Sequence, residues 1–230
     1  VNMGTNRTGI SINTLPDFYR NCCKLPWLSV QGLHCYDGNN GIAEYDAREK
    51  AVDKIDRAVF STVAALEQTG LPCPVLVMGG TPSFRCHARY KRVYLSPGTG
   101  IISDFGYASK FTDETFIPAC LLMTRVISHG GPGLFTLDLG YKGIAADPPG
   151  LKGCLMGDWH ASPINQNEEH WIWKMDEGYE DQRPGIGSVL YVIPTHICPT
   201  SALYPEALVA LDGQIVDIWE VTARNRKLSI

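Results

Sequence analysis

The chain has 230 residues, of which 44% are apolar, so it is long enough to bury the core of one large domain or of two modest ones. Its formal net charge of −4 argues against nucleic acid as the main partner, and no apolar run is long enough to cross a membrane. Eight cysteines without regular spacing indicate reduced thiols rather than a disulfide scaffold, so we expect a cytoplasmic protein.

The first residues, "VNMGTNRTG", lack an initiator methionine and predict a short strand followed by a glycine-rich turn. Such a start is typical of an interior segment, so we expect an upstream portion of the native polypeptide. Within the turn, Arg7 can donate hydrogen bonds to a ring nitrogen and does not give up its own proton. Taken alone, the motif favours an ordinary surface arginine between two glycines.

A strand–helix–strand unit follows. "LSVQGLHCY", from Leu28 to Tyr36, predicts a buried strand, and apolar residues at helical spacing predict a helix from Ala43 to Gln68. "PVLVMGG", from Pro74 to Gly80, is nearly continuous in apolar residues, as expected of a parallel strand covered on both faces. This order predicts a crossover in an α/β sheet or barrel.

Polar residues stand at the ends of both predicted strands. Tyr36 and Asp37 follow the first strand, where a barrel keeps functional groups, and His34 is interpreted as a core histidine. After the second strand, "GGTPSF" begins with two glycines that leave backbone N–H groups open, and Thr81 adds a hydroxyl. The loop could bind a phosphate, although taken alone the motif more often forms an ordinary tight turn.

From about Asp113 on, short alternating runs predict a mostly antiparallel β domain, with an Asp-Gly hairpin in "LDGQI". In "VIPTHICPT", His196 and Cys198 are two residues apart, and on a strand such residues share one face. Imidazole and thiolate suit zinc or a similar ion, but taken alone the motif favours two buried core residues. "NEEH", from Asn167 to His170, offers a further ligand or a solvated acidic turn.

In this order, "VNMGTNRTG", "GLHCYDG", "VLVMGGTPSF", "SPGTGIISDFGY", "DLGYKGIAAD", "NEEH" and "IPTHICPTSALY" resemble the D-threonine aldolase / D-serine dehydratase-like family. These are pyridoxal-phosphate (PLP) enzymes of the alanine racemase fold type. The resemblance implies an α/β fold: the later part of a (β/α)8 TIM-type barrel over residues 1–112, then a mostly antiparallel β domain over residues 113–230. It places the N-terminal part of the barrel outside this sequence and implies a homodimer.

The resemblance also implies a site and a reaction. The substrate would be a D-β-hydroxy-α-amino acid such as D-threonine, cleaved to glycine and an aldehyde with the help of a divalent metal (Zn, Mn or Mg). An arginine facing the pyridine nitrogen would keep that nitrogen unprotonated. The residues that the resemblance assigns to the cofactor are Arg7, Tyr36, Gly79, Gly80 and Thr81, and those that it assigns to the metal are His196 and Cys198.

Two departures from the family pattern leave alternatives open. The Schiff-base lysine of the family lies on the first barrel strand, and no lysine here stands in a matching context. Many relatives carry a histidine after "YDG", where this chain has Asn39 at the catalytic position, and an amide is no base near neutral pH. A D-serine dehydratase, an amino-acid racemase, a non-catalytic PLP-binding protein and a structural zinc protein are the competing interpretations.

Overall fold

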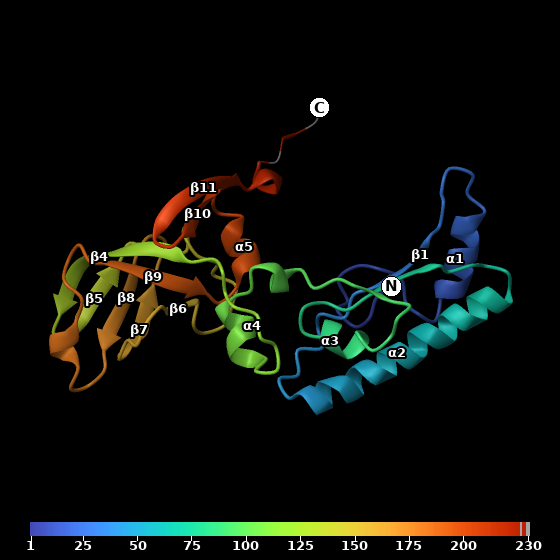
Figure 1. The fold of residues 1–230 in the computed structure, drawn as a ribbon, viewed down its shortest axis with the longest axis horizontal. Coiled ribbons are helices and arrows are strands. Elements are labelled where there is room, and N and C mark those ends of the chain that lie inside the picture. Colours follow the sequence, from blue (N-terminus) through green and yellow to red (C-terminus); the bar gives the residue numbers. More distant parts are fainter. Residues whose placement is uncertain (226, 229–230) are drawn as a thin grey trace. The chain divides into compact units, whose positions relative to one another are not determined.

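The computed structural model describes residues 1–225 and 227–228. The chain divides into two compact units (Figure 1). The first unit comprises Val1–Ile101 and Lys110–Thr115, and the second comprises Ile102–Ser109 and Phe116–Ile230. Among the described residues, no helix has the length and apolar character needed to cross a membrane.

The first unit is an α/β structure with a small parallel sheet in the order β1-β2-β3. Its elements are α1 (Leu15–Cys23), β1 (Gly32–Cys35), α2 (Tyr45–Gln68), β2 (Val75–Met78), α3 (Phe84–His87), β3 (Tyr94–Leu95) and the 3-10 turn η1 (Thr99–Ile101). The predicted strand–helix–strand order is therefore confirmed.

The prediction that the first strand begins at Leu28 was wrong, because β1 begins at Gly32 and Leu28 is exposed. Strand pairing starts with Gly32 opposite Val75, and the residue before Val75 is Pro74, which has no N–H to extend the ladder. The reading of His34 as a core residue was also wrong, since this residue is exposed on β1.

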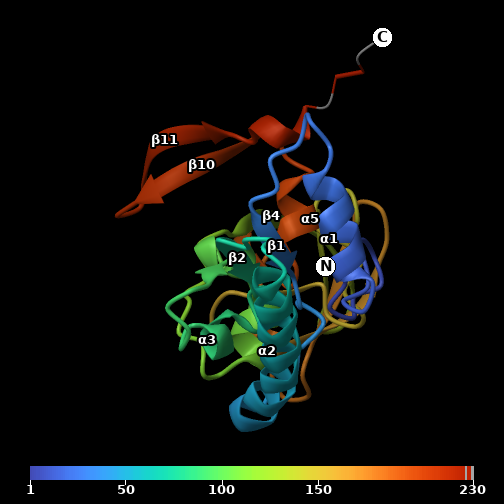
Figure 2. The ribbon, with the colours of Figure 1, turned by 90° about the vertical axis from the view of Figure 1, so that its right-hand side faces the viewer.

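Helices α1 and α2 pack on β1 and β2 around one core (Figure 2). Glu44 caps α2, because its carboxylate accepts hydrogen bonds from the N–H groups of Asp46 and Ala47. The buried stripe of α2 consists of Val52, Val59, Val63 and Leu66, much as the spacing predicted. Burying each such side chain contributes roughly 1.5–3 kcal/mol relative to leaving it in water.

The second unit is built on a six-stranded antiparallel sheet in the order β6-β9-β4-β5-β8-β7, which confirms the antiparallel prediction. Its core contains Phe135, Leu137, Trp171, Trp173 and Val192. The elements are α4 (Phe105–Lys110), β4 (Leu122–Gly131), β5 (Leu134–Leu137), β6 (Gly153–Leu155), β7 (Ala161–Gln166), β8 (Trp171–Met175), η2 (Glu180–Gln182), β9 (Val189–Pro194), α5 (Ile197–Ser201), β10 (Glu206–Leu211), β11 (Gln214–Glu220) and η3 (Thr222–Arg224).

Strands β10 and β11 form the hairpin that the Asp-Gly signal predicted. Asp212 and Gly213 both have positive φ, at 50° and 75°, as the central residues of a type I′ turn require. The hairpin carries several exposed apolar side chains, Trp219 among them.

Candidate functional site

Two loops of the first unit follow neighbouring parallel strands and are tied together. The first runs from Gly79 to Ser83 after β2, and the second begins at Ser96 after β3. The hydroxyl of Ser96 donates to the carbonyl oxygen of Gly79 at 2.6 Å, and the N–H of Thr99 donates to Oγ1 of Thr81 at 3.1 Å. The carboxyl ends of parallel strands are where α/β folds bind ligands, so the paired loops are the natural place for a site.

The ring of Tyr36 lies against glycine backbone next to these loops. A Cβ added to Gly80 would come within 2.6 Å of a Tyr36 ring carbon, and one added to Gly38 would come within 2.1 Å of the Tyr36 phenol oxygen. A larger residue at either position would displace the Tyr36 ring. The guanidinium carbon of Arg7 lies 5.4 Å from the centre of the same ring, within cation–π range. The structure therefore brings Arg7, Tyr36 and Gly80 to one place.

Asn39 stands beside the turn that carries Arg7. A Cβ added to Gly4 would lie 2.9 Å from Nδ2 of Asn39, and Gly4 itself is held by the side chain of Asn2, which accepts its N–H at 3.0 Å. Asn39 is exposed. Its amide can donate and accept hydrogen bonds, but it cannot take up a proton near neutral pH.

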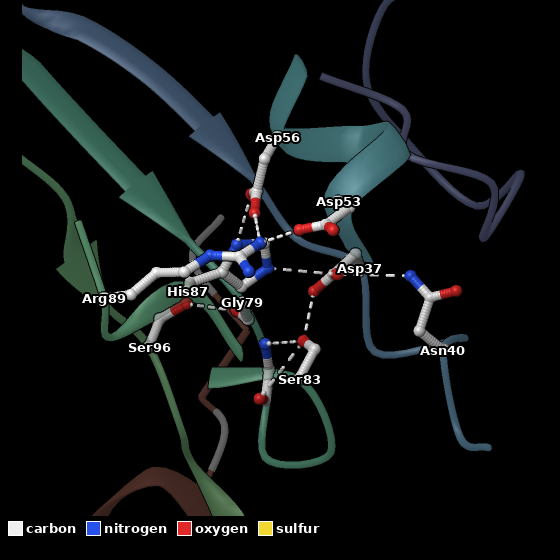
Figure 3. Close-up of polar contacts among 10 residues, drawn as sticks. Asp37, Asn40, Asp53, Asp56, Gly79, Ser83, His87, Arg89 and Ser96 are labelled. Atoms are coloured by element: carbon white, nitrogen blue, oxygen red, sulfur yellow. Dashed lines mark hydrogen bonds and ion pairs between the residues drawn. The ribbon is translucent and has the colours of Figure 1, made fainter. Parts of the chain in front are cut away.

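The carboxylate of Asp37 is buried and is hydrogen-bonded to the first loop through Ser83 (Figure 3). Its Oδ1 accepts a hydrogen bond from the Ser83 hydroxyl, and the same hydroxyl oxygen accepts the Gly80 N–H at 3.1 Å. Burial opposes the charged form, but hydrogen bonds from His87 and Ser83 more than offset it and hold the pKa of Asp37 below its usual value. The loop is thus anchored to a buried carboxylate.

The cluster fits a ligand with a phosphate group and an aromatic ring. The second loop is open beside Gly98, where an added Cβ would meet nothing within 4 Å. Since Oγ1 of Thr81 accepts the Thr99 N–H, the Thr81 hydroxyl proton can be donated to a bound oxyanion. The Thr81 hydroxyl and the open backbone at Gly98, next to the Tyr36 ring, suit the phosphate and the ring of PLP, whereas the Gly80 N–H is already donated to Ser83.

The second predicted site does not lie on a strand. Strand β9 ends at Pro194, His196 is the N-cap of helix α5, and Cys198 lies within the first turn of that helix. The expectation that His196 and Cys198 share one face of a strand was therefore wrong. The chain turns here because Asp104, some ninety residues earlier in the sequence, accepts the Ile197 N–H at 3.0 Å.

His196 nevertheless has the surroundings of a metal ligand. Its Nδ1 lies 2.6 Å from Oδ2 of Asp147, and both side chains are partly exposed. A carboxylate on one ring nitrogen fixes the imidazole and leaves the other nitrogen for a metal. Cys198 is exposed and is not in a disulfide. Among the described residues, no group of three or more His, Cys, Asp and Glu side chains is arranged to hold a metal.

The acidic segment "NEEH" forms an exposed turn between β7 and β8. Glu168 and Glu169 both pair with Lys142, at 3.2 Å and 2.9 Å. This geometry favours the solvated acidic turn over the interpretation as a further metal ligand.

The chain is similar in sequence to two kinds of D-amino acid enzyme. Residues 119–210 match the family model described as the putative serine dehydratase domain. D-Threonine aldolase of Arthrobacter sp. is 29% identical over 98% of this chain and 60% of its own length. D-threo-3-hydroxyaspartate dehydratase of Delftia sp. (strain HT23) is 28% identical over 68% of this chain and 46% of its own length. The resemblance to the D-threonine aldolase / D-serine dehydratase-like family is confirmed.

Solved structures show the same fold. D-Threonine aldolase from Filomicrobium marinum superposes with a TM-score of 0.87 at 23% identity, covering 97% of this chain and 62% of that structure. Alanine racemase of Clostridium difficile 630 superposes with a TM-score of 0.61 at 12% identity, covering 94% and 63%. The predicted alanine racemase-like fold, with a partial barrel and a β domain, is confirmed. The chain spans about three fifths of the length of these two enzymes.

Proposed function

We propose that this chain carries the cofactor-binding loops and the metal ligands of a PLP-dependent lyase. The enzyme cleaves D-threonine or a related D-β-hydroxy-α-amino acid to glycine and an aldehyde. The main structural support is the ring of Tyr36, which lies between Arg7 and Gly80 beside two loops suited to a phosphate. Similarity to a D-threonine aldolase along nearly the whole chain supports the same reaction.

In this proposal the first unit holds the cofactor. The loop from Gly79 to Thr81 binds the phosphate, and Tyr36 lies along the ring. Arg7 keeps its positive charge at all relevant pH values, so it donates to the pyridine nitrogen without protonating it. PLP, when bound, supplies an electron sink for the negative charge that develops on the substrate Cα. Covalent attachment of PLP needs a lysine, and the described residues of this cluster do not include one.

The metal ligands in this proposal are His196 and Cys198, with Asp147 as the group that orients His196. A bound divalent ion lowers the pKa of a hydroxyl that it coordinates, which is what cleavage next to a β-hydroxyl needs. Imidazole with thiolate favours zinc over manganese or magnesium. For D-threo-3-hydroxyaspartate dehydratase, alanine variants of a histidine and of a cysteine two positions apart have been solved, and the cysteine variant is described in a metal-free form.

The second candidate is a dehydratase, which the similarity to D-threo-3-hydroxyaspartate dehydratase supports. The metal ligands serve either reaction, because the same ion that acidifies a hydroxyl also helps hydroxide to leave. Asn39 does not separate the two either, since it can hold a substrate but cannot remove a proton.

Product analysis with D-threonine and D-serine tests the proposal. An aldolase gives glycine and an aldehyde, a dehydratase gives a keto acid and ammonia, and a racemase gives the inverted amino acid. Binding of PLP without turnover would instead support a non-catalytic PLP-binding protein. Unfolding by a chelator, rather than inactivation alone, would support a structural zinc protein.

We also propose that the protein works as a homodimer, as the resemblance implies. Sedimentation equilibrium of the purified protein tests this, and a mass of one chain at micromolar concentration would contradict it.

A further inference from the structure

His87 lies between two buried carboxylates (Figure 3). Its Nδ1 is 2.7 Å from Oδ1 of Asp56 and its Nε2 is 3.2 Å from Oδ2 of Asp37, and none of the three side chains has any solvent exposure. A neutral imidazole has a single N–H, whereas two carboxylates offer only acceptors. The geometry therefore requires a proton on both ring nitrogens, which makes His87 a buried cation.

Arg89 supplies a second positive charge next to His87. Asp56 also accepts a hydrogen bond from Arg89 at 2.9 Å, and Arg89 in turn pairs with Asp53 on the same helix, α2. Burial disfavours the imidazolium, but the hydrogen bonds to Asp37 and Asp56 outweigh it and raise the pKa of His87 to about 9. The carboxylates that face His87 come from the segment after β1 and from α2, so its charge state depends on both.

This buried cation is connected to the candidate phosphate loop by two routes. Asp37 contacts His87 through one carboxylate oxygen and accepts the Ser83 hydroxyl on the other, and Ser83 holds the Gly80 N–H. In addition, a Cβ added to Gly79 would lie 3.1 Å from Cδ2 of His87, so the ring packs directly against the loop backbone. Gly79 has a φ of +85°, a conformation in which the loop needs support.

We propose that protonated His87 is the positioning residue of the Gly79–Ser83 loop and acts on it through Asp37 and Ser83. The claim that the loop then binds a PLP phosphate rests on the proposed function. When His87 loses its proton, one ring nitrogen presents a lone pair to a carboxylate. The longer contact, to Asp37, breaks first, and the anchor of Ser83 shifts with it. The loop is therefore ordered while His87 is protonated and loses order when His87 is neutral.

The first test measures the proton and the loop together, in the full chain and without any ligand. Nitrogen-15 NMR between pH 6 and pH 10.5 reports the two imidazole nitrogens of His87 and the backbone amides of Gly79 and Gly80. We expect both nitrogens to carry protons through pH 8, and the two amides to titrate with the same midpoint as the ring. A singly protonated ring at pH 7 would overturn the proposal, and so would Gly79 and Gly80 amide signals that do not change as His87 titrates.

The second test separates positioning from folding. Replacing His87 takes a positive charge away from the buried carboxylates of Asp37 and Asp56 and risks unfolding, so the informative variant is Ser83→Ala, which cuts only the link to the loop. Its matched control is Asn40→Ala, because Asn40 donates to the same carboxylate of Asp37 at 3.1 Å without contacting the loop. The readouts are the dissociation constants of PLP and of inorganic phosphate, and the amide exchange rate of Gly80.

We expect Ser83→Ala to weaken PLP binding at least tenfold and to speed amide exchange at Gly80. Asn40→Ala should remain close to wild type in both readouts. His87 should stay doubly protonated in both variants. Equal exchange rates in the two variants would overturn the positioning role. If wild-type protein binds no PLP but the Gly80 amide still titrates with His87, the proposed function is contradicted and His87 remains the loop's positioning residue. Tight PLP binding with a neutral His87 would contradict the inference alone.

Discussion

Nδ1 of His196 lies 2.6 Å from Oδ2 of Asp147, so one nitrogen of this imidazole is already engaged by a carboxylate and the other is left for a further partner. The pair joins the N-cap of helix α5 to a residue nearly fifty positions earlier in the chain. Carboxylate–imidazole pairs of this kind orient metal ligands and raise their basicity.

Asp147→Asn should weaken binding of Zn²⁺ by about 10–100-fold, because the amide holds the ring less firmly and does not raise its basicity. His196→Ala and Cys198→Ala should remove measurable binding altogether, while PLP still binds. Titration calorimetry with Zn²⁺ alone measures all three. Glu169→Gln is the control, since this carboxylate is exposed and pairs with Lys142. Asp147→Asn with wild-type affinity would remove Asp147 from the metal site.

Arg7→Ala should change the absorption spectrum of bound PLP and weaken its binding, because the cation over the Tyr36 ring is lost and, in the proposed site, so is the donor to the pyridine nitrogen. Arg7→Lys is the matched control. It keeps a positive charge but not the planar guanidinium, so its spectrum should fall between wild type and Arg7→Ala. A spectrum of Arg7→Ala identical to that of wild type would place Arg7 outside the site.

The free energy of unfolding should fall by roughly 3 kcal/mol between pH 6 and pH 10 because of His87. Its pKa is raised from 6.5 to about 9 in the folded protein, so the folded state binds the proton more tightly than the unfolded state does. The stabilisation is fully present below pH 6.5 and is lost as the pH rises through 9. Cys35 lowers stability in the same direction above pH 9, because burial raises the pKa of this thiol to about 12 and it ionises only in the unfolded chain. Urea unfolding at four pH values measures the trend, and a flat profile would contradict it.

Glu114→Gln should stabilise the protein at pH 8 by on the order of 2–3 kcal/mol and leave its stability at pH 4 nearly unchanged. Both carboxyl oxygens of Glu114 are buried without a hydrogen-bond partner in the described structure, and burial raises its pKa to about 7. A raised carboxyl pKa means that stability is present at low pH and is lost as the pH rises through 7. Glutamine removes that loss. The free energy of unfolding at the two pH values measures it, and an equal effect at both would be inconsistent with this account.

Features that depend on local pattern could be predicted from the sequence. The apolar stripe of α2 repeats at helical spacing, the run before Gly79 is continuous in apolar residues, and Asp212 with Gly213 forms the turn of a hairpin. In each case the signal lies within a few residues of the element that it specifies. The resemblance to known enzymes added the cluster around Tyr36, which composition alone would not have indicated.

Features fixed by distant contacts could not be predicted. Helix α1 was missed because it buries little apolar surface, and one of its main contacts is the Tyr19 hydroxyl on the carbonyl of Pro72. Cys198 was placed on a strand because its local sequence alternates, whereas a hydrogen bond to Asp104 starts a helix there. The role of His87 depends on aspartates 31 and 50 residues away, and nothing in the local sequence links either of them to His87.

The linked charges of Asp37, Asp56, His87 and Arg89 limit how this sequence can diverge. A single replacement at Asp37, Asp56 or His87 leaves an uncompensated buried charge, a defect that typically destabilises a protein by about 3–5 kcal/mol, which is a large share of a normal folding free energy. Related sequences that still fold must therefore keep these residues or replace them in compensating pairs. Positions 37, 56, 87 and 89 should vary together among relatives, even though they lie on different elements of the fold.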